Sequence, residues 1–174
     1  MGAVYDAITN RFSTRGYTEE KLTDEELKLV LEAGLKAPTA ANKQELHFTV
    51  LSKDNPILQE IEDEKNLTRV AGSKNFYYDA PTVIIISGDV SFSWSALDAG
   101  IATQNIVLQA EELGLGSLII GCIKDALTGE KKAYFNQKLQ IPDGYQYYIA
   151  IALGHTALAK TPHTYDWSRQ VTCL

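Results

Sequence analysis

Hydrophobic residues along this 174-residue chain recur at two spacings, one typical of helices and the other of short buried strands. The helical spacing predicts helices near residues 4–8, 23–37, 55–61, 94–113 and 129–139. Short β-branched or apolar runs predict strands at residues 46–51, 81–88, 117–123 and 147–153. No linker, repeat or low-complexity segment interrupts this order, so we expect one α/β domain over residues 1–174.

Local chemistry marks both ends of the second helix. Thr23 stands three residues before Glu26, as in a capping box, and Pro38 disfavours helical geometry in the residue before it. The helix should therefore begin after Thr23 and stop near Ala37. Residues 37–44 are small or carry amides, and on their own they fit a plain helix-to-strand connection as well as a binding segment.

Three other segments differ in their expected burial. Residues 81–88 are almost continuously apolar, as in a central strand that is buried on both faces. The helix at 94–113 has few charges before Glu111, which predicts burial either inside the domain or against a second copy of the chain. The polar run 62–75 mixes both charge signs, and the sequence leaves open whether it forms a mobile flap over a pocket or a solvated helix and loop.

Composition and charge narrow the possible functions. Hydrophobic residues make up 45% of the chain and charged residues 22%, which is typical of a globular protein. The net charge of −6 has the wrong sign for a surface that binds DNA or RNA. The two cysteines, Cys122 and Cys173, have no metal-ligand spacing, and no targeting or membrane-spanning segment is evident, so we expect a cytoplasmic protein without a metal site.

Candidate chemistry begins at residues 11–15, Arg-Phe-Ser-Thr-Arg, which we expect within one helical turn at the end of the first helix. The guanidinium groups of Arg11 and Arg15 suit a phosphate, because a planar fork of donors binds it bidentately and never loses its charge. The same two arginines also suit a helix C-terminus, where positive charge complements the macrodipole. These five residues alone leave both interpretations open, with the helix terminus favoured.

No motif for side-chain catalysis is found in the sequence. The Gly114-Leu115-Gly116 stretch has neither the spacing nor the position of a dinucleotide-binding turn, because it follows a helix and precedes a strand. His155 and His163 have no nucleophile placed beside them by a recognisable turn. If the chain is an enzyme, a bound cofactor would carry the chemistry.

Several stretches, taken together and in order, resemble the nitroreductase family of FMN-dependent oxidoreductases. The stretches that carry the resemblance are 11–15, 37–44, Ala80-Pro81, Asp98-Ala99-Gly100, Gln104-Asn105, 113–117, Ile120-Gly121, 141–145 and 151–154. The resemblance covers nearly the whole chain and changes the balance at residues 11–15 in favour of a phosphate site. It implies a mixed, mostly antiparallel sheet flanked by helices, in an intertwined homodimer.

The resemblance also implies roles for individual residues at one end of the cofactor. Arg11 and Ser13 would hold the phosphate and ribityl chain of FMN. Arg15 would reach the pyrimidine edge of the flavin and stabilise the negative charge that forms there on reduction. Lys160 falls near the basic residues that bind the phosphate late in the family's sequences, whereas His163 stands where another basic residue is expected.

Two other segments are assigned by the same resemblance. Ile120 and Gly121 match the strand end whose backbone N–H faces flavin N5. This family also contributes one segment to the site from the partner subunit. Its match in this sequence is Pro38, Thr39, Ala40 and Asn42, with Gln44 nearby. Only a few residues separate Asp89 from Trp94, where larger relatives insert helices over the pocket, so the chain resembles a minimal member with a more open site.

The activity implied is transfer of hydride from NADH or NADPH, through flavin N5, to a nitro, quinone or similar small acceptor. Donor and acceptor would use the same flavin face in turn, in a ping-pong mechanism. Two alternatives remain at this point. The chain could store or deliver flavin without significant turnover, or it could catalyse a specialised reaction of the same fold, such as flavin breakdown or reductive dehalogenation.

Overall fold

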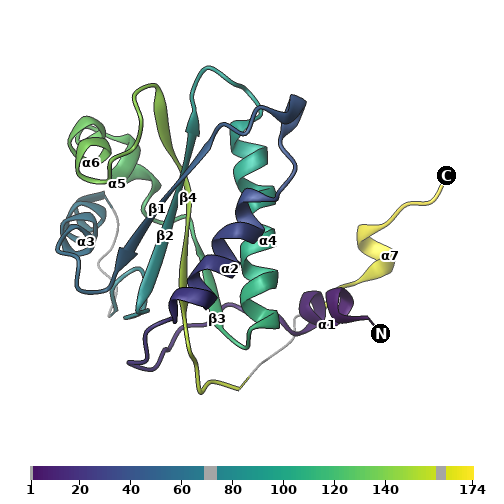
Figure 1. Cartoon of the computed structure of the whole chain (residues 1–174). Coiled ribbons are helices and arrows are strands. Elements are labelled where there is room, and N and C mark those ends of the chain that lie inside the picture. Colours follow the sequence, from purple (N-terminus) through teal and green to yellow (C-terminus); the bar gives the residue numbers. More distant parts are fainter. Residues whose placement is uncertain (1, 69–73, 160–163) are drawn as a thin grey trace.

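A four-stranded sheet lies between two layers of helices in the computed structural model, which describes residues 2–68, 74–159 and 164–174 (Figure 1). The strands are β1 (Leu46–Ser52), β2 (Thr82–Asp89), β3 (Gly116–Ile120) and β4 (Tyr145–Gly154). The helices are α1 (Ala3–Asn10), α2 (Asp24–Leu35), α3 (Ile57–Thr68), α4 (Ser95–Glu112), α5 (Lys124–Thr128), α6 (Lys132–Lys138) and α7 (Trp167–Gln170), with a 3-10 turn η1 (Ala40–Asn42).

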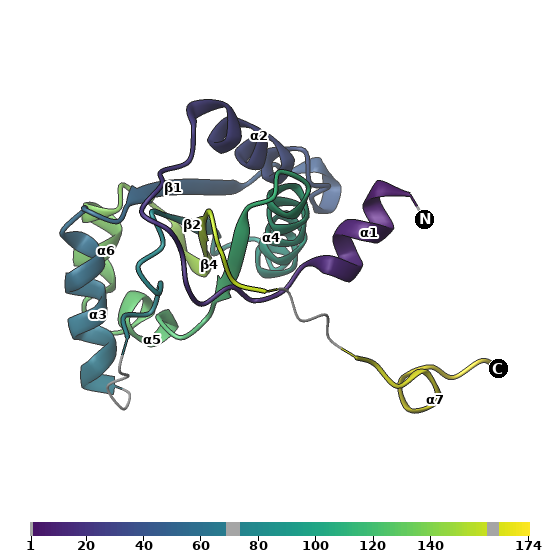
Figure 2. The same ribbon diagram turned by 90° about the horizontal axis from the view of Figure 1, so that it is seen from below.

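The sheet has the order β1-β2-β4-β3, and each neighbouring pair of strands is antiparallel. Residues 82–88 of β2 are all buried, which confirms the expectation of a central strand covered on both faces. Figure 2 shows α2 and α4 on one side of the sheet and α3, α5 and α6 on the other. The mixed α/β architecture predicted from the sequence is therefore confirmed.

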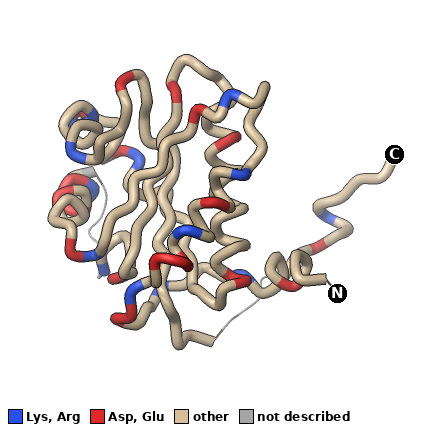
Figure 3. The backbone as a smooth tube through the Cα atoms, in the orientation of Figure 1, with Lys and Arg blue, Asp and Glu red and all other residues tan. Residues whose placement is uncertain are grey.

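Each face of the sheet has its own apolar core. Alternate residues of β2 divide between the two cores, since Val83 and Ile85 face α3, α5 and α6, whereas Ile84 and Ile86 face α2 and α4. Charged residues stand on the helices and loops, and among Lys, Arg, Asp and Glu the strands carry only Asp89 (Figure 3). In the part of the chain that the structure describes, no helix has the length and hydrophobicity needed to cross a bilayer.

The capping chemistry of α2 is as predicted. The backbone N–H of Glu26 donates to Oγ1 of Thr23 (3.2 Å), and the backbone N–H of Thr23 donates to Oε2 of Glu26 (2.7 Å). The donation from the Thr23 backbone lowers the pKa of the Glu26 carboxyl below its ordinary value. The last helical residue is Leu35, close to the predicted stop, since Lys36 is the C-terminal cap.

The predicted helix at 94–113 is α4, whose buried face packs on the sheet and on α2. Leu97 and Ile101 lie outside that face and are 59% and 41% exposed, so one apolar stripe of α4 is uncovered in the single chain. The helix ends at Glu112 and is capped by Leu113, and the next residue, Gly114, has a φ of +75°, in the left-handed region that glycine adopts without strain. The N–H of Leu115 then donates back to the carbonyl of Ala110 (2.8 Å).

Two segments differ from the prediction. The expected strand at 117–123 ends at Ile120, because the chain turns there and begins α5 at Lys124. The expected helix at 129–139 is shorter and begins at Lys132, after Gly129, whose ψ of −149° is far from helical geometry. A Cβ at Gly129 would lie only 2.6 Å from the carbonyl oxygen of Asp125, which explains the glycine. Helix α5 has a single helical turn and carries too short a pattern to be recognised.

The polar run 62–75 is partly resolved by the structure. Residues 62–68 belong to α3, whereas residues 69–73 of the predicted flap or loop lie outside the described residues. Within α3, Glu62 and Lys65 form a buried ion pair (2.7 Å between Oε1 and Nζ). The backbone N–H of Phe76 donates to Oε2 of the same Glu62 (2.9 Å). The start of this run is therefore not a simple solvated helix.

We expect Lys65→Met to lower the free energy of unfolding by about 3 kcal/mol, because it leaves the buried Glu62 carboxylate without its countercharge. Chemical denaturation would measure the change. Lys28→Met is a matched control, since Lys28 pairs with Glu32 on the solvent-exposed face of α2 and should cost little. Equal effects of the two substitutions would contradict the buried-pair account.

Candidate functional site

Residues 11–15 lie along the free edge of the sheet, beside β3. Arg11 caps α1 with φ −57° and ψ 132°, so the chain leaves helical geometry there. Ser13 forms a parallel β-bridge with Ser117, and the N–H of Thr14 donates to the carbonyl of Ser117 (2.9 Å). The expectation that these residues share one helical turn is wrong. The edge strand offers unpaired backbone groups, and pairing with them holds the segment extended.

Close packing fixes this segment against the strand. Thr14 is fully buried, and a Cβ at Gly116 would lie 2.7 Å from its Oγ1. The hydroxyl of Tyr17 donates to the carbonyl of Thr14 (3.1 Å). Burial raises the pKa of Tyr17 well above its ordinary value, against a smaller opposing effect of Arg15, so the phenol keeps the proton that it donates. The close approach of Thr14 to β3 thus needs a glycine at position 116.

The two guanidinium groups of this segment have different surroundings. Nη1 of Arg11 is buried and has no hydrogen-bond partner among residues 2–68, 74–159 and 164–174. Arg15 is exposed, and its Nη1 donates to the carbonyl of Ser13 (3.3 Å). A buried donor without an acceptor is costly, and a phosphate oxygen would satisfy it. Arg11 therefore fits the phosphate site that the sequence predicts.

Residues 38–44 form a strained turn between α2 and β1. Three residues of the turn that are not glycine, Ala41, Asn42 and Gln44, have φ of 52°, 52° and 53°. Such left-handed geometry is unfavourable for residues with a Cβ and is often found at binding sites. The turn is held partly by Thr39, whose Oγ1 accepts from the backbone N–H of Gln44 (3.0 Å). It is more constrained than a plain connection needs to be.

A carboxylate on α4 also holds this turn. The backbone N–H of Ala40 donates to Oδ2 of Asp98 (3.0 Å), and Asp98 is only 3% exposed. No role for Asp98 is predicted from the sequence. One signal was available, because Asp98 is the only charged residue between Ser95 and Ala110. A lone charge on an otherwise apolar helix indicates a specific partner.

Ile120 and Gly121 lie where β3 ends. The side chain of Ile120 is buried, and its carbonyl accepts from the hydroxyl of Tyr147 (2.8 Å). Gly121 is exposed, and a Cβ built on it would meet no atom within 4 Å. A hollow of about 510 Å³ opens nearby, and it is lined by Ala96, Gly100, Thr103, Ile119, Lys124, Thr128, Gln146, Tyr147, Tyr148 and Ile149.

The structure brings only some of the predicted residues together. The turn at 38–44 attaches at Asp98, near the start of α4, whereas residues 11–15 pack beside Gly116, just past the end of the same helix. Fifteen residues separate Asp98 from Leu113, which corresponds to about 22 Å along a helix. One subunit therefore does not gather both segments into one pocket. Lys160 and His163 lie outside the described residues.

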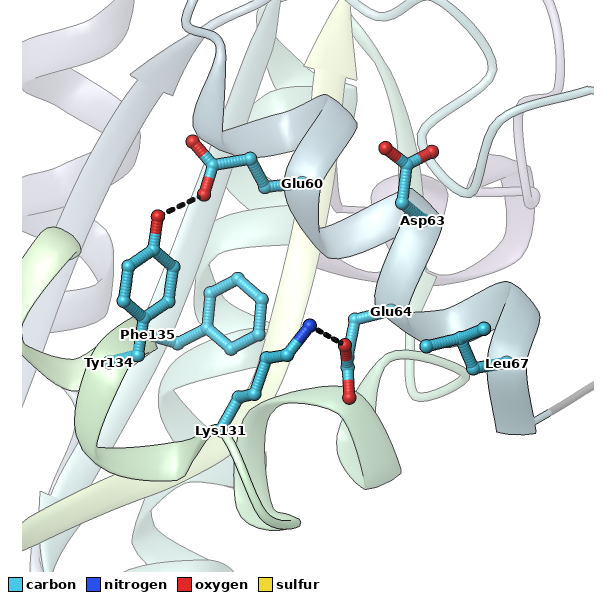
Figure 4. A pocket seen from close by; sticks show the side chains of 7 residues that line it. All are labelled: Glu60, Asp63, Glu64, Leu67, Lys131, Tyr134 and Phe135. Carbon is cyan, nitrogen blue, oxygen red and sulfur yellow. Dashed lines mark hydrogen bonds and ion pairs between the residues drawn. The ribbon is translucent and has the colours of Figure 1, made fainter.

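A groove of about 540 Å³ between α3 and α6 contains none of the predicted residues (Figure 4). Two pairs of its polar side chains bond across the groove, Tyr134 to Glu60 and Lys131 to Glu64 (2.6 Å between Nζ and Oε2). These bonds fasten the two helices together. In the described ranges, no three His, Cys, Asp or Glu side chains lie close enough together to hold a metal ion.

Comparison with known proteins gives a consistent result. A family profile described as "Nitroreductase family" matches residues 8–155. The FMN reductase [NAD(P)H] of Bacillus subtilis is 28% identical over 146 residues, which cover 71% of this chain and 56% of that protein.

Solved structures show the same likeness. A nitroreductase with bound FMN from Desulfitobacterium hafniense matches with a TM-score of 0.89 and 27% identity, over 100% of this chain and 99% of the other. An FMN-dependent nitroreductase from Clostridium difficile matches with a TM-score of 0.83 and 28% identity, over 98% of both chains.

We expect Gly116→Ala to destabilise the protein by about 1–3 kcal/mol, because the added methyl group would overlap the buried side chain of Thr14. Thermal or chemical denaturation would measure the loss. Gly100→Ala is the control, since a Cβ on this exposed helical glycine meets nothing within 4 Å and alanine favours a helix. If Gly116→Ala were as stable as Gly100→Ala, the close approach of residues 11–15 to β3 would be disproved.

Proposed function

The chain belongs to the nitroreductase family, and on that premise we propose that it is an FMN-dependent oxidoreductase which uses NADH or NADPH to reduce a nitro, quinone or similar small acceptor. The names of its relatives support this activity, since one is an FMN reductase and two are nitroreductases that bind or depend on FMN. Bound FMN would supply the hydride chemistry at N5. The two free cysteines agree with action in the reducing cytoplasm.

The observation that best supports the proposal is the buried, unpartnered Nη1 of Arg11 within the described chain. Arg11 would bind the FMN phosphate, and the hydroxyl of Ser13 would assist from the edge of β3. The exposed guanidinium of Arg15 would lie toward the pyrimidine edge, where fixed positive charge stabilises the negative charge that develops on reduction. Lys160, which lies outside the described residues, is a further candidate for binding the phosphate on the family resemblance alone.

Ile120 and Gly121 would receive the reactive edge of the ring. The hydrogen bond between Ile120 and Tyr147 fixes the end of β3, and the open space at Gly121 lets a ring approach the backbone. A backbone N–H at this position would orient the ring, and hydride transfer at N5 would need no side chain that acts as an acid or a base. The chain then contributes position and charge, whereas the cofactor contributes the chemistry.

We infer that the active form is a homodimer, because one subunit separates residues 11–15 from the turn at 38–44. Pro38, Thr39, Ala40, Asn42 and Gln44 would complete the site of the partner subunit. The apolar stripe of α4 at Leu97 and Ile101 is exposed in the single chain and suits burial in a symmetric interface. Helix α7 extends from the body in both ribbon views, with Trp167 65% exposed, and would wrap around the second subunit (Figure 2).

Anaerobic mixing tests the activity directly. Protein reconstituted with FMN should lose its flavin absorbance within seconds of adding NADH or NADPH and regain it on adding menadione or a nitroaromatic compound. Initial rates at several concentrations of both substrates should give the parallel lines of a ping-pong mechanism. Flavin that binds but stays oxidised would favour storage or delivery, and protein that does not bind FMN would remove the proposal.

We expect Arg11→Ala to raise the Kd for FMN about 10-fold or more, because it removes a charge-assisted contact with the phosphate. Fluorescence quenching of FMN on titration with protein would measure the change. Lys21→Ala is the control, since it removes a positive charge that lies on the surface beside Asp54. An unchanged Kd for Arg11→Ala would refute the phosphate assignment while leaving the family membership intact.

A further inference from the structure

We propose that Asp98 is a positioning residue, whose buried carboxylate holds the turn at 38–44 in the conformation that completes the flavin site of the partner subunit. The inference rests on the proposed function. It assigns a role to a side chain that lies far from Arg11 and Arg15 of its own subunit.

Burial and bonding make Asp98 a specific anchor. Asp98 is 3% exposed on the helix face that packs into the core, so an unpartnered charge there would be strongly unfavourable. The partner in the structure is the backbone N–H of Ala40 at 3.0 Å, from a segment 58 residues earlier in the chain. A hydrogen bond to an ionised acceptor is stronger than one between neutral groups. The bond therefore ties the first residue of η1 to the rigid start of α4.

The backbone of the turn needs such an anchor. Ala41, Asn42 and Gln44 all have left-handed φ values, which are unfavourable for residues with a Cβ. A turn of this kind persists only where surrounding contacts determine its geometry. Without the bond to Asp98, we expect the backbone between Thr39 and Gln44 to move toward more favourable φ values.

Two other contacts hold the turn, one that joins its two ends and one at its far end. Thr39 bonds to the N–H of Gln44, within the turn itself. Lys43 lies over the ring of Phe92, with Nζ 5.9 Å from the ring centroid, and its charge helps lower the pKa of Asp89, after the larger effect of the hydrogen bonds from Ser91. Asp98 is the anchor that fixes the other end, where Ala40 begins η1.

The turn presents exposed side chains that would contact the ligand, so the bond to Asp98 matters for binding. Asn42 and Gln44 are exposed, and the Nε2 group of Gln44 donates to Oδ1 of Asn42 (3.2 Å). Their amides are the groups that would face a ligand across the interface. Binding groups must be held within a fraction of an ångström by their supporting residues. A relaxed turn would lower flavin affinity although no ligand contact had been deleted.

The first test compares Asp98→Ala and Asp98→Ser with Asp98→Asn. Alanine and the shorter serine both lose the bond to Ala40, whereas asparagine keeps an acceptor oxygen. We expect the Kd for FMN to rise about 10-fold for alanine and serine and to stay within about 3-fold of the wild type for asparagine. Serine serves if alanine does not fold.

Asn105→Ala is the matched control. Asn105 lies on the same helix and also bonds to the backbone of a distant segment, but as the donor, from its Nδ2 to the carbonyl of Ala33 in α2 (3.1 Å). It should lower stability without changing the Kd for FMN. An equal rise in Kd for Asn105→Ala and Asp98→Ala would overturn the inference, because general destabilisation would then explain both.

Hydrogen exchange gives a readout that does not depend on flavin. In protein without FMN, the Ala40 amide should exchange at least 10-fold faster in Asp98→Ala than in the wild type or Asn105→Ala. Faster exchange with an unchanged Kd would overturn the positioning role and leave the proposed function intact. Failure of the wild type to bind FMN would instead remove the proposed function, and this inference with it.

Mixed dimers test whether the effect crosses the interface. Asp98→Ala and Arg11→Ala subunits, carrying different affinity tags, would be unfolded together, refolded and purified as heterodimers. If Asp98 acts on the partner's site, one site receives both defects and the other receives none, so one tight FMN site per dimer should return. If Asp98 acts within its own subunit, both sites stay impaired, and the inference is overturned.

Discussion

Helix α4 is the element on which the arrangement of the site depends. Its buried face packs on the sheet, so its position and direction are set by the core. Asp98 holds the turn at 38–44 near one end, and at the other end the chain passes through Gly114 directly into β3, where residues 11–15 attach. A helix of this length does not bend enough to bring its ends together. The separation of the two segments is therefore a fixed property of one subunit, and the two-fold association proposed above would unite them.

Much of the fold could be predicted from the sequence because it depends on local patterns. The spacing of apolar residues located α2, α4 and all four strands, and the capping box placed the start of α2 at Thr23. Errors arose where tertiary contacts outweigh local preference. Residues 11–15 have the sequence pattern of a helix end, but hydrogen bonding to the free edge of β3 holds them extended. Helix α5 was missed because it is too short to show a helical period.

The site shows the same division between local and tertiary information. The resemblance named Arg11, Ser13 and the turn at 38–44, but it did not identify the residues that hold them. Thr14 packs against Gly116, and Asp98 bonds to Ala40 over 58 positions of sequence. Such pairs have no periodic signature and become visible only when the chain is folded. Asp98 came nearest to being predictable, since it is the lone charge on sixteen residues of an otherwise uncharged helix segment, Ser95–Ala110.

Charge and strain explain why the supporting residues matter as much as those that would touch the ligand. The chain carries a net charge of −6, so attraction of a phosphate must come from a local arrangement and not from the overall field. An arginine provides that arrangement only if its backbone is fixed, which is the effect of pairing residues 13 and 14 with the edge of the sheet. At the turn, left-handed residues keep two amide side chains exposed at the cost of backbone strain. The sheet edge fixes residues 11–15 and helix α4 fixes the turn at 38–44, although neither short segment would keep its conformation alone. Anchoring of this kind lets a small domain present precisely placed binding groups from its loops.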